Sequence, residues 1–124
     1  MQLEYELIDK TNINLATSMQ YTIFPNACAY EHYKYSIDNK YKTEMYYIAK
    51  HNNIPVGITG LYANDKIDNE SIWLGWFGVL PEFRSKGIGK QILLDTIEKA
   101  KQYNKKYFRL YTNDKRNVFS KTII

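Results

Sequence analysis

The sequence has almost no cysteine, and we expect neither a signal peptide nor a membrane-spanning helix in it. Cys28 is the single cysteine among 124 residues, so no disulfide forms within the chain and a disulfide-stapled secreted framework is excluded. Glu4, Glu6 and Asp9 lie among the first residues, where a signal peptide would be basic and then apolar. The longest uncharged apolar stretch, residues 71–81, is too short to span a bilayer as a helix. These absences predict a small cytoplasmic protein without a membrane partner.

Arginine is also scarce, although the chain is basic. Only Arg84, Arg109 and Arg116 are arginines among 17 basic residues, and the net charge is +4. Arginine reads base edges and phosphates better than lysine does, and the lysines are scattered along the chain. We therefore expect no nucleic-acid partner. The modest positive net charge is better suited to a small, highly anionic ligand.

The residues that are present describe one globular domain. Hydrophobic residues make up 44% and charged residues 24% of the chain, which excludes wholesale disorder. A chain of 124 residues can bury a core without a structural metal, and no repeat or linker divides it. We expect a single domain over residues 1–124 and no metal site.

The order of periodic segments predicts an α/β (α+β) fold, a mixed central sheet flanked by helices in the order β-α-α-β-β-β-α-β-(α). An asparagine-rich turn at residues 51–53 predicts a hairpin. Strict alternation would place Trp73 and Trp76 on opposite faces of their strand. The expected strands are residues 2–8, 45–50, 54–63, 71–80 and 107–112, and the expected helices are residues 12–22, 26–39, 87–103 and 114–120.

The loop between the fourth strand and the third helix carries the chemistry. A helix start offers free backbone N–H groups and the positive end of a dipole, which together bind phosphate. Gly87 and Gly89 let an anion approach the backbone, and Arg84, Lys86 and Lys90 add positive charge at the same place. This combination predicts a diphosphate site.

The spacing within the loop excludes two common nucleotide motifs. A P-loop needs Ser or Thr where Gln91 stands, and a dinucleotide fingerprint needs a third glycine where Ile92 stands. The pattern that fits is R-x-x-G-x-G, formed by Arg84, Gly87 and Gly89. It resembles the acetyl-CoA pyrophosphate loop of the GNAT superfamily of N-acetyltransferases.

The resemblance covers essentially the whole chain, including Phe24-Pro25 between the first two helices and the strand that starts at residue 54. It implies direct transfer of an acetyl group from acetyl-CoA to a primary amine of an unidentified acceptor, without a metal or a covalent enzyme intermediate. It also implies that the central strand pairs with the pantetheine arm and polarises the thioester carbonyl. The cofactor-binding residues that it implies are Phe77, Gly78, Val79, Arg84, Ser85, Lys86, Gly87, Ile88, Gly89, Lys90 and Asn117.

The positions that handle protons depart from the family. Trp73 stands where some members keep a glutamate base, and Glu70 is the nearest acid upstream, separated from Phe77 by about 23 Å of extended strand. Glu31 and His32 lie in the helix that borders the acceptor pocket in the family and are alternative bases. Tyr111, on the strand beside the implied thioester, substitutes for the usual acid. Glu70, Glu31 and Tyr111 are therefore the candidate catalytic residues.

The last residues depart from the family as well. Counted from Asn117, Ser120 takes the family's alanine position and Ile124 its tyrosine position. Measured against the family, two C-terminal strands would be missing, and the outer edge of the last strand would be open. The sequence therefore leaves two functions: an N-acetyltransferase, or a non-catalytic CoA-binding module completed by dimerisation or domain swapping. We expect either a homodimer, in which another copy of the chain covers the open edge, or a marginally stable fragment.

Overall fold

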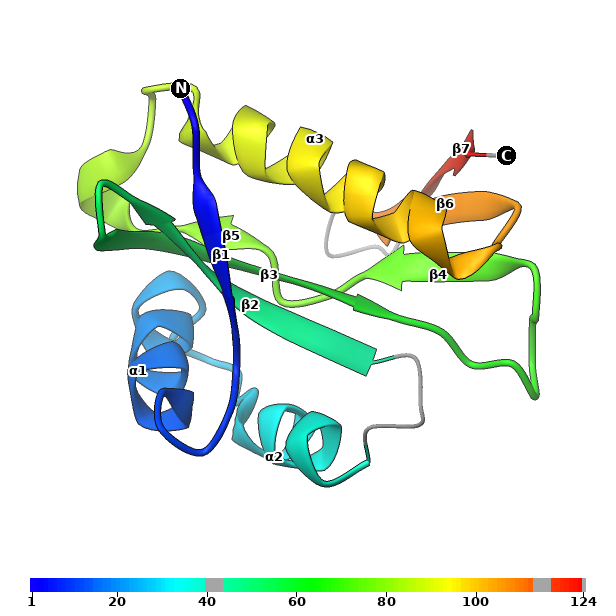
Figure 1. The fold of residues 1–124 in the computed structure, drawn as a ribbon, viewed down its shortest axis with the longest axis horizontal. Helices are drawn as coiled ribbons and strands as arrows, with labels where there is room; N and C mark the ends of the chain where they lie inside the picture. Colours follow the sequence, from blue (N-terminus) through cyan, green and yellow to red (C-terminus); the bar gives the residue numbers. More distant parts are fainter. Residues whose placement is uncertain (40–43, 113–116, 124) are drawn as a thin grey trace.

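The computed structural model describes residues 1–39, 44–112 and 117–123 and shows a seven-stranded sheet with helices on both faces (Figure 1). The strands lie in the order β1-β2-β3-β4-β6-β7, and β5 pairs with β3. The pairing of β4 with β6 is parallel, and the other described pairings are antiparallel. The strands are β1 (Glu4–Leu7), β2 (Glu44–His51), β3 (Ile54–Tyr62), β4 (Ser71–Leu74), β5 (Gly78–Val79), β6 (Tyr107–Tyr111) and β7 (Val118–Thr122). The helices are α1 (Ile13–Ile23), α2 (Tyr30–Asp38) and α3 (Ile88–Ala100), with 3-10 turns η1 (Pro81–Phe83) and η2 (Lys101–Tyr103).

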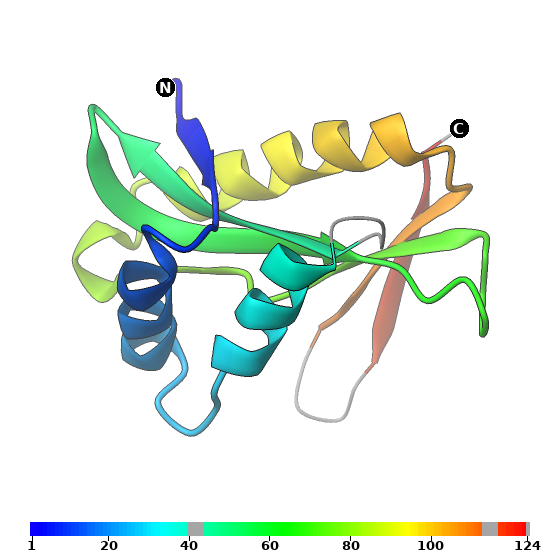
Figure 2. The ribbon, with the colours of Figure 1, turned by 60° about the horizontal axis from the view of Figure 1, so that its bottom comes forward.

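The helices form layers on opposite faces of the sheet, which confirms the predicted fold class. In Figure 1, α1 and α2 lie below the strands and α3 lies above them, and Figure 2 shows the same separation. We call these the α1/α2 face and the α3 face. Apolar side chains of the central strands are buried against both layers, which is why their sequences are apolar at successive positions. The α1/α2 core contains Ala16, Met19, Tyr33, Tyr46, Ile48 and Ile58, and the α3 core contains Val56, Leu61, Ile72, Ile88, Ile92 and Phe108.

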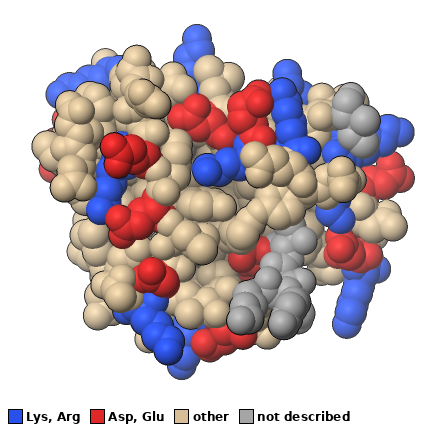
Figure 3. Space-filling view, in the orientation of Figure 1, with Lys and Arg blue, Asp and Glu red and all other residues tan. Residues whose placement is uncertain are grey.

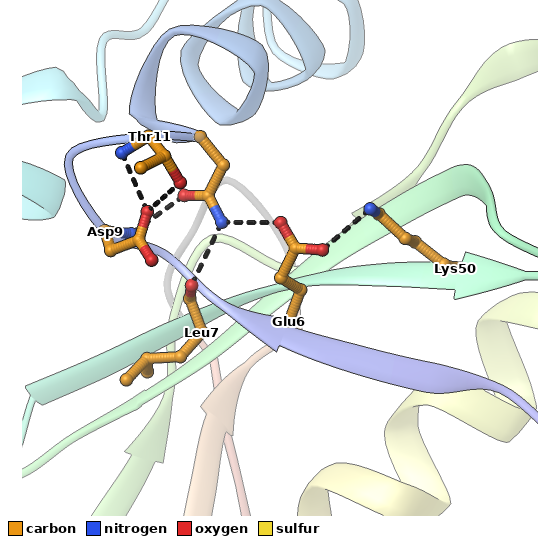
Figure 4. Close-up of polar contacts among 6 residues, drawn as sticks. Glu6, Leu7, Asp9, Thr11 and Lys50 are labelled. Carbon is orange, nitrogen blue, oxygen red and sulfur yellow. Dashed lines mark hydrogen bonds and ion pairs between the residues drawn. The ribbon is translucent and has the colours of Figure 1, made fainter.

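A buried asparagine ties the end of β1 to the start of α1 (Figure 4). Asn12 is 6% exposed, and its Nδ2 donates to Glu6 Oε1 (2.8 Å) and to the Leu7 carbonyl (3.0 Å). Its Oδ1 accepts the Asp9 N–H at 2.8 Å, and Lys50 Nζ pairs with Glu6 Oε2 at 2.7 Å. The hydrogen bond from Lys50, followed by that from Asn12, holds the pKa of Glu6 below its usual range.

The side chain of Gln20 organises the link between α1 and α2. It is fully buried, and its Nε2 donates to the carbonyls of Phe24 (3.1 Å) and Ala27 (2.8 Å). Its Oε1 accepts the Ala29 N–H at 2.9 Å. Because these backbone groups are satisfied outside a helix, α2 begins at Tyr30 rather than at residue 26, where we predicted its start.

The predicted hairpin is confirmed as β2 and β3, with a turn one residue shorter than expected. Asn52 and Asn53 have φ values of 49° and 67°, as a two-residue turn with left-handed backbone requires. His51 pairs with Ile54 and so belongs to β2 rather than to the turn.

The described residues after β6 include a strand, so the helix predicted over residues 114–120 is wrong where the structure describes it. Residues 113–116 lie outside the described residues, and Val118–Thr122 forms β7, antiparallel to β6 from Tyr107↔Thr122 to Tyr111↔Val118. The edge of β6 offers a row of backbone donors and acceptors, and the β-branched and aromatic residues of this segment suit a strand. The predicted open edge on β6 is therefore wrong too, because β7 covers it.

The surface carries charges of both signs. Figure 3 shows acidic and basic side chains interspersed over the face seen in Figure 1, so the positive balance is not gathered into one patch on that face. Within the described residues, the helices are too short or too polar to cross a membrane.

Candidate functional site

A bulge breaks the predicted fourth strand into β4 and β5. On β3, two residues separate Leu61 from Ile58, whereas three separate their partners Leu74 and Gly78 on the facing chain. One extra residue opposite a regular strand is a β-bulge, which bends the chain and redirects its side chains. Trp76, inside the bulge, has a φ of 51°, a left-handed conformation that is rare for a bulky residue. Such conformations cluster at functional sites.

The extra residue places both tryptophans on the α1/α2 face, so the predicted opposite orientation is wrong. Trp73 stacks on Tyr62 with ring centroids 6.4 Å apart, and Tyr62 lies two residues from Gly60, the partner of core residue Tyr46. Trp76 packs against the same α1/α2 core. Residues three apart in a regular strand point to opposite faces, but the bulge adds one step and restores the same face.

Beyond the bulge, β5 separates from β6. β6 pairs with β4 at residues 71–73, whereas among the described residues β5 pairs with β3 alone. The Leu80 N–H donates to the Val56 carbonyl on β3 at 2.9 Å, so the N–H and C=O of Val79 point to the opposite side. An open strand edge of this kind can pair with an extended ligand.

The first turn of α3 follows the bulged strand through η1. Gly87 is the N-cap of α3, no side chain caps the helix, and its first turn holds no acidic residue. The N–H groups of this turn are therefore available to bind an anion at the positive end of the helix dipole. Arg84 Nε donates to the Val79 carbonyl at 3.1 Å, which holds the guanidinium beside the strand.

The two glycines of the loop serve different purposes. Gly87 has a φ of 81°, which favours glycine, although a Cβ there would meet no atom within 4 Å. Gly89 has no such backbone requirement, and a Cβ there would lie 3.4 Å from Val79 Cγ2. The fold alone thus has little need for glycine at position 89, whereas a diphosphate that approaches the helix backbone does.

The predicted cofactor residues of the strand lie next to the start of α3. Phe77 and Val79 pack against Ile88 and Ile92 in the core below α3. Asn117 stands apart from the start of any helix, contrary to our prediction. Its carbonyl accepts the Thr112 N–H at 2.7 Å, so it belongs to the connection between β6 and β7.

The predicted catalytic residues lie in different places. Tyr111, at the end of β6, has its ring centroid 5.0 Å from that of Trp73, close to where β4 and β6 diverge. Glu70 lies at the other end of β4, where its carboxylate is 4.0 Å from Lys106 Nζ. Glu31 is exposed in the first turn of α2. The structure thus brings Tyr111, but not Glu70, close to the bulge.

Sequence reasoning missed Glu44, a shielded carboxylate on the α1/α2 face. Its side chain is 18% exposed, and Oε1 accepts the Tyr46 hydroxyl at 2.6 Å and lies 3.6 Å from Nδ1 of His32. The ring of His32 lies 5.8 Å from that of Trp76 in the bulge. Burial, reinforced by the bond to Glu44, raises the pKa of Tyr46 well above its usual range. Alternation along β2 places Glu44 on the same face as Tyr46, which is the signal that could have identified it.

Comparisons with solved structures support the fold. An IAA acetyltransferase from Bacillus cereus has a TM-score of 0.68 at 20% identity, with 91% of this chain and 67% of that chain covered. A GNAT family acetyltransferase from Elizabethkingia anophelis with acetyl-CoA bound has a TM-score of 0.64 at 25% identity, with 90% and 66% covered. The PaiA N-acetyltransferase of Thermoplasma acidophilum in complex with coenzyme A has a TM-score of 0.70 at 14% identity, with 94% and 83% covered.

At the level of sequence, no curated protein matches the chain. Residues 13–121 do match the sequence model of the Acetyltransferase (GNAT) family. Because the matched residues run from the start of α1 into β7, the chain belongs to the GNAT family of acetyltransferases.

Proposed function

We propose that the protein is an N-acetyltransferase that moves an acetyl group from acetyl-CoA directly to a primary amine. The observation that carries the proposal is the junction of the bulged strand with the uncapped start of α3, fastened by the bond from Arg84 to Val79. Similar proteins have been solved with acetyl-CoA or coenzyme A bound, which supports the same ligand for this junction.

The pyrophosphate of acetyl-CoA lies, in this proposal, on residues 84–90. The N–H groups of the first turn of α3 bind its oxygens, and Arg84, Lys86 and Lys90 neutralise its charge. The pantetheine arm lies between β5 and β6 and pairs with the backbone of Phe77 and Val79. The thioester carbonyl then accepts a backbone N–H of the bulged strand, which stabilises the negative charge that develops on its oxygen.

The reaction needs one nucleophile and two proton transfers. The lone pair of the amine nitrogen forms the C–N bond, the C–S bond breaks with its electrons on sulfur, the nitrogen loses one proton and the sulfur gains one. We assign the proton donor for sulfur to Tyr111, because of its position near the divergence of β4 and β6. Glu31 and His32 of α2 are better placed than Glu70 to accept the proton of the amine.

Calorimetric titration with acetyl-CoA, run beside a thiol-release assay on a panel of amines, tests the proposal. We expect the Arg84→Glu variant to lose acetyl-CoA binding, and a matched variant with the same charge change in the 64–70 loop, Lys66→Glu, to keep it. Wild-type affinity in Arg84→Glu contradicts the site. Binding without thiol release on any amine supports a non-catalytic CoA-binding module instead.

A further inference from the structure

We propose that Glu44 and an aromatic stripe of Tyr62, Trp73 and Tyr111 bind the acceptor, and that the acceptor is a diamine or a longer amine with two cationic nitrogens. The inference rests on the proposed function, because it names the substrate class of that reaction. It places one nitrogen at Glu44 and the reacting nitrogen near the bulge.

Glu44 is a shielded carboxylate that can hold the cationic end of an acceptor. Its side chain is 18% exposed, and its Oε1 accepts the Tyr46 hydroxyl and lies 3.6 Å from Nδ1 of His32. Among the residues that the structure describes, no lysine or arginine pairs with it. A shielded carboxylate is costly unless it is paired, so a bound cation there recovers free energy that the lysines and arginines among the described residues do not provide.

An aromatic stripe leads from Glu44 to the bulge across the α1/α2 face. Glu44 pairs in register with Tyr62 on β3, and Tyr62 pairs in register with Trp73 on β4. The ring centroids of Tyr62 and Trp73 are 6.4 Å apart, and those of Trp73 and Tyr111 are 5.0 Å apart. Ring faces attract ammonium groups and also pack well against methylene chains. The stripe therefore suits an alkyl amine that extends away from Glu44.

The distance between Glu44 and the bulge determines the length of the acceptor. β2 and β4 are separated by β3, and neighbouring strands lie about 4.8 Å apart, so the two points are about 10 Å apart or more. A short monoamine can occupy only one of them. An amine with a second cationic nitrogen at this distance can occupy both.

The one arginine in the same row of side chains turns away from the bulge. Arg109 pairs in register with Trp73, but its Nε donates to Ser71 Oγ at 2.7 Å and its Nη1 donates to Ser120 Oγ at 2.7 Å. Its guanidinium carbon lies 4.8 Å from the centroid of Tyr107. The positive charge is thus held at the start of β4, and the opposite end of the stripe remains suited to a cation.

The test is a binding titration of the CoA-loaded protein, followed by tryptophan fluorescence and calorimetry. Diaminoheptane, which carries an amine at each end, is compared with heptylamine, which has the same chain and one amine. We expect the diamine to bind the wild type more tightly than heptylamine does. Glu44→Gln should lower the affinity for the diamine at least about tenfold and change the affinity for heptylamine by less than about twofold. Glu4→Gln removes an exposed carboxylate of β1, the strand at the far edge of the sheet, and should leave both affinities unchanged.

A measurement on the unmodified protein supplements the variant in case Glu44→Gln fails to fold. Salt screens ion pairs, so raising the ionic strength should weaken the diamine more than heptylamine. Equal affinity for the two amines, equal salt dependence, or wild-type diamine affinity in a folded Glu44→Gln overturns the inference. Failure of the proposed function has a different signature, namely no CoA binding or no thiol release in the same samples. The amine titration is run both with and without CoA, so it reports in either case.

Discussion

The Nε of Arg84 donates to the carbonyl oxygen of Val79 at 3.1 Å, so the arginine that opens the phosphate loop is attached to the bulged strand. This bond joins the two halves of the proposed acetyl-CoA site, the part for the pyrophosphate and the part for the thioester. Arg84 therefore contributes geometry as well as charge.

We expect Arg84→Lys to weaken acetyl-CoA binding about tenfold although the charge is kept. Lysine has no Nε–H in a rigid fork, so it cannot hold the Val79 carbonyl and present further donors to phosphate at once. Arg84→Gln, which also loses the charge, should weaken binding further. Calorimetric titration with acetyl-CoA measures both effects, and thermal unfolding should change little because Arg84 is exposed. Equal affinities for the Lys variant and the wild type would show that Arg84 acts by charge alone.

Alanine at the two loop glycines should have different effects on the stability of the protein. Gly87→Ala should destabilise the protein by about 1 kcal/mol, because the φ of 81° disfavours a Cβ. Gly89→Ala should leave stability unchanged or raise it by up to about 1 kcal/mol, because alanine favours the helix. Its Cβ would nevertheless obstruct the pyrophosphate, so we expect acetyl-CoA affinity to fall at least about tenfold.

Urea unfolding and calorimetry on the same two samples separate these effects. A Gly89→Ala variant that binds acetyl-CoA as the wild type does would contradict close approach of the ligand to the helix backbone. Loss of stability in Gly89→Ala would instead show that the contact with Val79 is already too tight.

Asn12→Ala should destabilise the protein by about 2 kcal/mol. The substitution removes three hydrogen bonds of a side chain that is 6% exposed, and it leaves the Leu7 carbonyl and the Asp9 N–H without their partner. Urea unfolding measures the change. Thr11→Ala, whose hydroxyl donates to Asp9 at an exposed site, is the matched control and should cost much less. Equal costs for the two variants would refute the structural role of Asn12.

The ion pair of Glu6 with Lys50 should make stability depend on acid pH. The pKa of Glu6 is lowered in the folded state, first by the hydrogen bond from Lys50, so the unfolded chain binds a proton more readily than the folded one does. The resulting stability is fully present above the ordinary glutamate pKa and is lost as the pH falls through the folded value. Lys50→Met should therefore flatten the fall in stability below about pH 5, as urea midpoints across that range would show. Lys10→Met is the control, and an equal flattening there would contradict the assignment.

The elements that were predicted correctly are those determined by their own residues. The α3 helix follows from a periodic apolar stripe, the β2–β3 hairpin from Asn52-Asn53, and the phosphate loop from glycines and cations at a helix start. The bulge at Trp76 was not predictable in this way, because it is defined by a mismatch with β3 rather than by its own residues. Glu44 was missed although alternation along β2 places it beside Tyr46, because its other neighbour, His32, comes from α2.

For the segment after β6, the wrong type of element was predicted. A helix was predicted over residues 114–120, whereas Val118–Thr122 satisfies the edge of β6 as β7. The strand forms because its residues favour β structure and because the edge of β6 offers backbone hydrogen bonds. Only the first of these causes can be read from the sequence.

Tyr33 and Tyr46 allow a direct comparison of two buried tyrosines. Their rings are 5.3 Å apart, but their hydroxyls differ in hydrogen bonding. Within the described residues the Tyr33 hydroxyl is buried without a hydrogen-bond partner, and burial raises its pKa, whereas the Tyr46 hydroxyl donates to Glu44 at 2.6 Å. Tyr33→Phe removes an unsatisfied polar group, so stability should hold or rise by about 1 kcal/mol. Tyr46→Phe deprives the shielded Glu44 carboxylate of its donor and should cost about 2 kcal/mol in urea unfolding. A loss above about 1 kcal/mol in Tyr33→Phe would mean that an ordered water satisfies the hydroxyl in solution.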